Sequence, residues 1–139
     1  MFYDDSLIFG EDDGSSLAIV EFKKPGRDDY RFGPSKSDPV VQVVETLEKA
    51  LERGSAQKKD GEIFSFARVT RRVAYIIADL TPTLIKTLKR HSFQNDWNPR
   101  IWHQYRPNEE MAVYVYGYDT MIENAKKRNA AFFSVLLGD

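Results

Sequence analysis

The chain has 139 residues, a formal net charge of −1 at pH 7, no cysteine and two histidines. This length is enough for one core of ordinary size, so we expect a single domain over residues 1–139. The lack of cysteine excludes disulfides, thiolate metal sites and cysteine nucleophiles. Two isolated histidines argue against a zinc site, so a bound metal ion is expected to be Mg²⁺ or Mn²⁺, held by oxygen ligands.

The chain has no feature that directs it to a membrane or out of the cell. No apolar stretch reaches the roughly 18 residues of a spanning helix, and the N-terminus lacks the basic-then-apolar pattern of a signal peptide. We therefore expect a cytoplasmic protein with no membrane contact.

Two strands joined by a tight turn are predicted at the start of the chain. The apolar run at residues 7–9 is followed by the turn-rich residues 10–14 and by a second apolar run at residues 17–25. Glycine and aspartate in the intervening segment favour a hairpin, which would bring Asp5 beside Glu21.

The second strand ends in charged residues that share one face. Side chains alternate along a strand, so Glu21 and Lys23 point to one face while Phe22 points to the other. Ionic groups at the end of a buried strand are costly unless they bind something. Two carboxylates and a lysine converging there predict a divalent metal site formed by Asp5 and Glu21.

The middle of the chain predicts a helix, a loop and a further strand. Asp38 and Pro39 are typical of a helix start, and Gly54 is typical of its end. Residues 55–62 are polar and are expected to form a loop, and residues 73–78 are expected to form a buried strand.

The last part of the chain predicts a helix, a strand and a final helix. Thr81 and Pro82 again indicate a helix start, and the pattern weakens over residues 93–108, where we expect irregular structure with one strand at 101–105. Residues 111–116 are rich in β-branched and aromatic side chains, which favours a strand. Thr120 fits a capping box that opens a helix to about residue 137.

Alternating strands and helices predict an α/β fold with a mixed β-sheet, an N-terminal antiparallel hairpin and flanking helices. His91 and His103 have no carboxylate or histidine partner at ligand spacing, so we expect them at the surface or packed on aromatic rings. Basic residues are grouped and could contact phosphates, although such groups are also typical of ordinary solvated faces. The groups are Lys23, Lys24, Arg27 and Arg31; Arg68, Arg71 and Arg72; Lys86, Lys89 and Arg90; and Lys126, Lys127 and Arg128.

The charged motif resembles that of a known nuclease superfamily. Asp5, then Glu21-Phe22-Lys23 on the next strand, then a helix carrying Gln42, is similar to the PD-(D/E)XK nucleases. Further segments extend the similarity to the C-terminal nuclease domain of Shedu-type antiphage proteins. These segments are residues 20–30, 38–42, 75–82 and 125–133.

The resemblance implies a restriction-endonuclease-like core and metal-dependent hydrolysis of DNA, in antiphage defence or DNA processing. Asp5, Glu21 and the backbone carbonyl of Phe22 would bind Mg²⁺ or Mn²⁺. Lys23 would act on the phosphate and not in the core, and Gln42 would hydrogen-bond the attacking water or the Lys23 amine.

Each of these roles has a structural alternative. Glu21 and Lys23 could form an ion pair on an exposed strand end, Asp5 could cap a turn, and Gln42 could be solvated. The whole domain could also be a catalytically weak nuclease fold that serves as a DNA-binding or oligomerisation module. A third alternative is an unrelated α/β domain with a surface Glu–Lys pair.

The chain departs from the family pattern at three places. Asp4 stands where the motif often has proline, and Thr46 stands where relatives often have tyrosine. The family usually has a helix before the first acidic motif, so we expect either a fragment of a longer protein or a domain with a short active-site wall. Loss of that helix would expose Phe2, Leu7 and Phe9 and favour a homo-oligomer or contact with an upstream segment.

Overall fold

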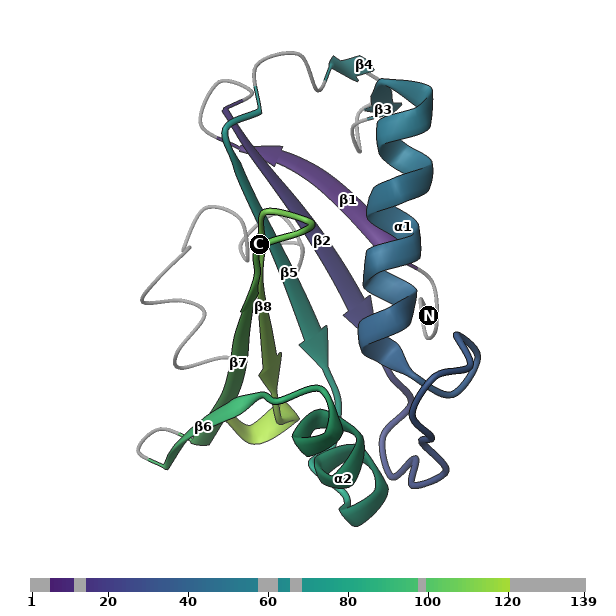
Figure 1. Ribbon diagram of the computed structural model, residues 1–139, viewed down its shortest axis with the longest axis vertical. Coiled ribbons are helices and arrows are strands. Elements are labelled where there is room, and N and C mark those ends of the chain that lie inside the picture. The colour runs from purple at the N-terminus through teal and green to yellow at the C-terminus, as the bar shows by residue number, and fades with distance from the viewer. Residues whose placement is uncertain (1–5, 12–14, 58–62, 66–68, 98–99, 121–139) are drawn as a thin grey trace.

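The computed structural model describes residues 6–11, 15–57, 63–65, 69–97 and 100–120. Within them, six strands form one mixed sheet in the order β1-β2-β5-β8-β7-β6 (Figure 1). The strands are β1 (Ser6–Glu11), β2 (Ser16–Phe22), β5 (Arg71–Ile77), β6 (Gln94–Trp97), β7 (Arg100–Arg106) and β8 (Met111–Tyr116). The predicted α/β class is therefore confirmed.

The centre of the sheet is parallel and its edges are antiparallel. Strands β2, β5 and β8 run in the same direction, which the arrows of Figure 1 show. β1 pairs antiparallel with β2, so the predicted N-terminal hairpin is confirmed, and β7 and β6 continue the other edge antiparallel. The central strands are nearly continuous apolar runs because a parallel sheet is buried on both faces.

Both described helices begin where the caps predicted. Helix α1 (Pro39–Arg53) starts at Asp38, whose side chain accepts hydrogen bonds from two backbone N–H groups of the first turn. It ends at Gly54, which adopts the left-handed conformation that glycine tolerates, with φ of 74°. Helix α2 (Pro82–Arg90) starts at Thr81, with proline at its first position.

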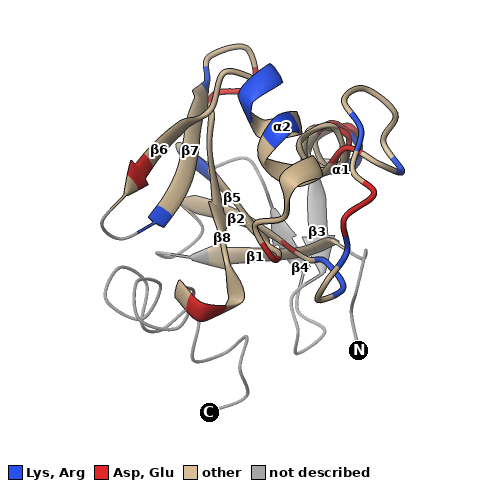
Figure 2. Cartoon of the chain, turned by 90° about the horizontal axis from the view of Figure 1, so that it is seen from below, with Lys and Arg blue, Asp and Glu red and all other residues tan. Residues whose placement is uncertain are grey.

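The two described helices pack on the same face of the sheet (Figure 2). The core on that face contains Leu17 and Ile19 of β2 together with Val43 of α1 and Leu84 of α2. Alternate residues of the same strands form a second buried cluster on the opposite face. Its members are Ala18, Val20, Tyr75, Ile77, Ile101 and Tyr116. Because Glu21 continues the Leu17–Ile19 alternation, it faces α1.

Two predictions on local structure are wrong. Residues 55–57, expected in a loop, form β3 (Ser55–Gln57), which pairs with β4 (Ile63–Ser65). Within 93–108, the strand expected at 101–105 is confirmed as β7, but the irregular structure expected before it is wrong, because β6 pairs with β7 along the whole length of β6. The polar composition of β6 conceals this edge strand, whose formation depends on its partner and not on its own pattern.

Other predictions lie outside the described residues. These include Asp5, the predicted metal ligand, its neighbour Asp4, Phe2 and the basic group at 126–128. The expectation that Thr120 caps the last helix is wrong, because the chain is already helical from Tyr118; the predicted course of this helix beyond residue 120 lies outside the described residues. Neither α1 nor α2 has the length and apolar character that crossing a membrane requires.

Candidate functional site

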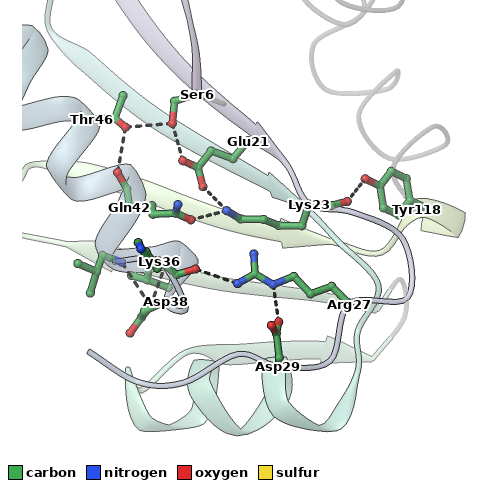
Figure 3. Close-up of polar contacts among 12 residues, drawn as sticks. Ser6, Glu21, Lys23, Arg27, Asp29, Lys36, Asp38, Gln42, Thr46 and Tyr118 are labelled. Atoms are coloured by element: carbon green, nitrogen blue, oxygen red, sulfur yellow. Dashed lines mark hydrogen bonds and ion pairs between the residues drawn. The ribbon is translucent and has the colours of Figure 1, made fainter. Parts of the chain in front are cut away.

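The candidate site forms where β1, the end of β2 and the first half of α1 meet (Figure 3). The antiparallel register places Ser6 of β1 directly opposite Glu21 of β2. Lys23 follows β2, and its backbone N–H donates to the Ile77 carbonyl oxygen of β5 at 2.8 Å. The parallel pairing therefore holds the main chain at Lys23 in place.

Glu21 and Lys23 form a buried ion pair. The Lys23 Nζ lies 3.4 Å from the Glu21 Oε2, and the side chains are 0% and 1% exposed for Lys23 and Glu21 respectively. The expectation that Lys23 lies outside the core is therefore wrong, and so is the alternative of an ion pair on an exposed strand end. Burial changes the energetics, because removal of one partner leaves an uncompensated charge in the interior.

Gln42 holds the ammonium group from the other side. The Lys23 ammonium donates to the Gln42 side-chain oxygen, which α1 presents from its first turns (Figure 3). Gln42 itself is half-buried at the border of the apolar face of α1. The structure thus brings Glu21, Lys23 and Gln42 together, while their catalytic roles stay predictions.

Two hydroxyl side chains close the cluster. Ser6 donates to the Glu21 carboxylate, and the Thr46 Oγ1 lies 3.0 Å from the Ser6 Oγ and 2.9 Å from the Gln42 carbonyl oxygen. Ser6, Glu21, Lys23, Gln42 and Thr46 are called the Glu21 cluster below. Sequence reasoning missed the role of Ser6, although hairpin register could have found it. Thr46 was noticed only as a departure from tyrosine, yet it lies one helical turn beyond Gln42.

The main chain at the cluster is also held by a tyrosine from the segment that follows β8. Tyr118 is the second residue beyond β8, and its hydroxyl donates to the Lys23 carbonyl oxygen, which fixes the main chain just after β2. Phe22 turns its side chain to the opposite face, where it packs against the second buried cluster. Its contribution to a metal site can therefore come only from its backbone.

Among its described residues, the Glu21 cluster has one carboxylate that could serve as a metal ligand, that of Glu21. Among the described residues, no group of three or more His, Cys, Asp or Glu side chains is placed to hold one. The oxygen atoms of Glu21 and Gln42 fit a hard cation such as Mg²⁺, but such an ion would share the Glu21 carboxylate with the Lys23 ammonium. The second predicted ligand, Asp5, lies outside the described residues.

A buried aspartate anchors the start of α1 and thereby positions Gln42. The pKa of Asp38 is lowered, because hydrogen bonds from His91 and from the Gly33 N–H outweigh the effect of burial, which raises it. The His91 Nε2 lies 2.7 Å from the Asp38 Oδ2. His91 has no carboxylate partner at ligand spacing in the sequence, and folding supplies one from 53 positions away, Asp38. The predicted packing of His91 on an aromatic ring is confirmed, since the ring centroids of His91 and Phe32 are 4.6 Å apart.

The basic group next to the cluster is not a uniform patch. Lys23 is buried, and the Arg27 Nε lies 2.5 Å from Asp29, whose pKa the hydrogen bond from Arg27 lowers. The loop that carries Arg27 is fixed to the end of β5, because the Gly26 N–H donates to the Asp79 Oδ2 at 2.6 Å. Most of this loop therefore has a structural role.

Comparison of the chain with protein-family models, with curated proteins and with solved structures gives no match. The function proposed below is therefore inferred from the geometry of the Glu21 cluster and from the sequence motif.

Proposed function

We propose that the chain is a metal-dependent nuclease of the PD-(D/E)XK type that hydrolyses DNA phosphodiester bonds, in antiphage defence or DNA processing. The observation that carries the proposal is the buried Glu21–Lys23 pair at the end of β2, with Gln42 of α1 on the ammonium. Buried ionic groups are rare where only stability is needed, and they are common at functional sites. The β1–β2 hairpin, the parallel β2–β5 pair and α1 support a restriction-endonuclease-like core.

Four residues of the Glu21 cluster, together with Asp5 and the Phe22 backbone, have roles in this proposal. Glu21 and Asp5, with the Phe22 carbonyl, would hold Mg²⁺ or Mn²⁺, which when bound lowers the pKa of an attacking water and polarises the phosphate. Lys23 would place its positive charge beside the phosphate oxygens. Gln42 orients the ammonium, and the Ser6 hydroxyl orients the Glu21 carboxylate.

The burial of the pair has a consequence for substrate binding. Both charged groups already have partners inside the protein, so a phosphate reaches Lys23 only after the side chains around the pair move. A metal ion at Glu21 would compete with the ammonium for the same carboxylate. We therefore expect metal binding and phosphate binding to be coupled to separation of the Glu21–Lys23 pair.

The test is cleavage of supercoiled and linear DNA by the full chain with Mg²⁺, Mn²⁺ or EDTA. We expect cleavage with either metal ion and none with EDTA. Glu21→Gln keeps the size of the side chain and removes its charge, so it should abolish cleavage. Glu45→Gln is the matched control, because Glu45 is exposed on α1 and should retain activity.

The assay is run well below the melting temperature of each variant, which circular dichroism determines. Full activity of Glu21→Gln in a folded protein would contradict the proposal, as would cleavage that persists in EDTA.

A second candidate is a catalytically weak nuclease fold that acts as a DNA-binding or oligomerisation module. It is favoured by the contacts that Glu21 and Lys23 make with each other, with Ser6 and with Gln42 inside the protein. The single carboxylate among the described residues of the cluster also favours it. Exposed Lys86, Lys89 and Arg90 on α2 would then contact the phosphate backbone. DNA retention in a gel-shift assay, without cleavage in Mg²⁺ or Mn²⁺, would favour this candidate.

A further inference from the structure

A second candidate site lies on the other side of the sheet from α1 and α2. A cavity of about 700 Å³ opens there, at the starts of β2 and β5 and along β8. Ser16, the first residue of β2, lines it, whereas Glu21 lies near the end of that strand. The cavity therefore lies on the opposite face of the sheet from the Glu21 cluster and at the opposite end of β2.

Tyrosine rings form one wall of this cavity, which is called the tyrosine cavity below. Tyr75 and Tyr114 stack with ring centroids 5.8 Å apart and an interplanar angle of 21°, and Tyr114 stacks on Tyr116 at 6.2 Å and 26°. Tyr105 lines the same cavity and is 62% exposed. Tyr75 and Tyr116 are buried, so the exposed Tyr105 and the half-buried Tyr114 are the rings suited to stacking with a further aromatic ring.

Arginine side chains line the cavity beside the rings. The Arg71 Nε donates to the Ser16 Oγ at 3.1 Å, and the Arg72 Nη1 donates to the Glu109 carbonyl oxygen at 2.8 Å. These contacts orient both guanidinium groups before any ligand arrives. Among the described residues of the lining, Arg71 and Arg72 are basic and Glu110 is acidic, so this described part carries one more positive than negative charge.

We propose that the tyrosine cavity binds a nucleoside phosphate, either free or as the phosphorylated end of a single strand. Its volume lies within the roughly 300–1,000 Å³ of small-molecule sites. The rings of Tyr105 and Tyr114 would stack on the base, and the guanidinium groups of Arg71 and Arg72 would bind the phosphate by charge-assisted hydrogen bonds. Glu110 would accept hydrogen bonds from the sugar or base.

Other ligand classes match the lining less well. A purely apolar ligand would desolvate the guanidinium groups and offer them no hydrogen-bond acceptor in return. Duplex DNA keeps its bases stacked inside the helix, where the rings cannot reach them. The proposal does not depend on nuclease activity, since it concerns binding at a separate site.

The test is isothermal titration calorimetry of the full chain in EDTA, which prevents metal-dependent cleavage. The probes are adenosine monophosphate, adenosine, inorganic phosphate and a 5′-phosphorylated single-stranded hexanucleotide. We expect saturable binding of one monophosphate per chain, about tenfold or more tighter than adenosine or phosphate alone. Tighter binding of the hexanucleotide would assign the site to strand ends, and equal or weaker binding would assign it to free nucleotides.

Paired variants locate the binding. Tyr105→Ala and Arg71→Gln should each weaken monophosphate binding at least about fivefold, while the exposed controls Trp97→Ala and Arg53→Gln should not change it. Binding at the Glu21 cluster would not respond to Tyr105→Ala, so the two sites are distinguishable. The proposal is overturned if the folded chain binds none of the nucleotides at millimolar concentration, if both cavity variants bind like wild type, or if phosphate alone binds as tightly as the monophosphate.

Discussion

Asp38→Ala is expected to destabilise the protein strongly, because one buried carboxylate has four hydrogen-bond partners. One oxygen of Asp38 accepts the backbone N–H groups of Val40 and Val41, which caps α1. The other accepts from the Gly33 N–H at 2.8 Å and lies 2.7 Å from the His91 ring. The side chain is fully buried, so water does not replace the lost partners.

The expected loss of stability in Asp38→Ala follows from these contacts. Loss of an N-cap costs about 1 kcal/mol, and the lost hydrogen bonds to Gly33 and His91 add about 2 kcal/mol. The total of about 3 kcal/mol corresponds to a fall in melting temperature of about 10 °C for a chain of this size. Asp38→Asn keeps a capping oxygen but turns an amide N–H group toward Gly33, so we expect about half of that loss.

The pH dependence of stability tests whether the charge of Asp38 is what holds these partners. Because the pKa of Asp38 is lowered in the folded state, its charge stabilises the fold above the unfolded pKa of about 3.9. This contribution is lost as the pH falls through the folded pKa. The difference in melting temperature between wild type and Asp38→Asn should therefore shrink as the pH falls below about pH 4.

The assay is thermal unfolding followed by circular dichroism between pH 3 and pH 7. A difference that stays constant down to pH 3, or a loss under about 1 kcal/mol for Asp38→Ala, would refute the argument that the charged carboxylate holds these partners.

Two further predictions concern the Glu21 cluster. Lys23→Met keeps the side-chain volume but leaves Glu21 buried without its cation, so the free energy of unfolding should fall by about 3 kcal/mol. The control Lys24→Met replaces an exposed lysine and should change the free energy of unfolding little. Equal urea midpoints for the two variants would contradict the role of the buried pair. Tyr118→Phe removes the hydrogen bond to the Lys23 carbonyl and should cost about 1 kcal/mol in urea denaturation. If the proposed nuclease activity exists, Tyr118→Phe should also lower it, and unchanged stability would show that this contact does not hold the end of β2.

The parts of the fold that sequence alone determined depend on short-range physics. Asp38 and Pro39 determine where α1 begins, and Gly54 determines where it ends. Each of these residues acts on backbone within a few positions of itself. The central strands were equally predictable because a strand buried on both faces must be an apolar run. Alternation along β2 was also enough to place Glu21 and Lys23 on one face.

Tertiary structure decided what the charged residues contact and how far they are buried. Ser6 faces Glu21 through strand register, and Tyr118 reaches the Lys23 carbonyl across 95 positions of sequence. His91 meets Asp38 across 53 positions, so spacing along the chain could not pair them. The burial of the Glu21–Lys23 pair arises where β1, β2 and α1 pack together, because exposure is a property of neighbours brought together by folding and not of the local pattern.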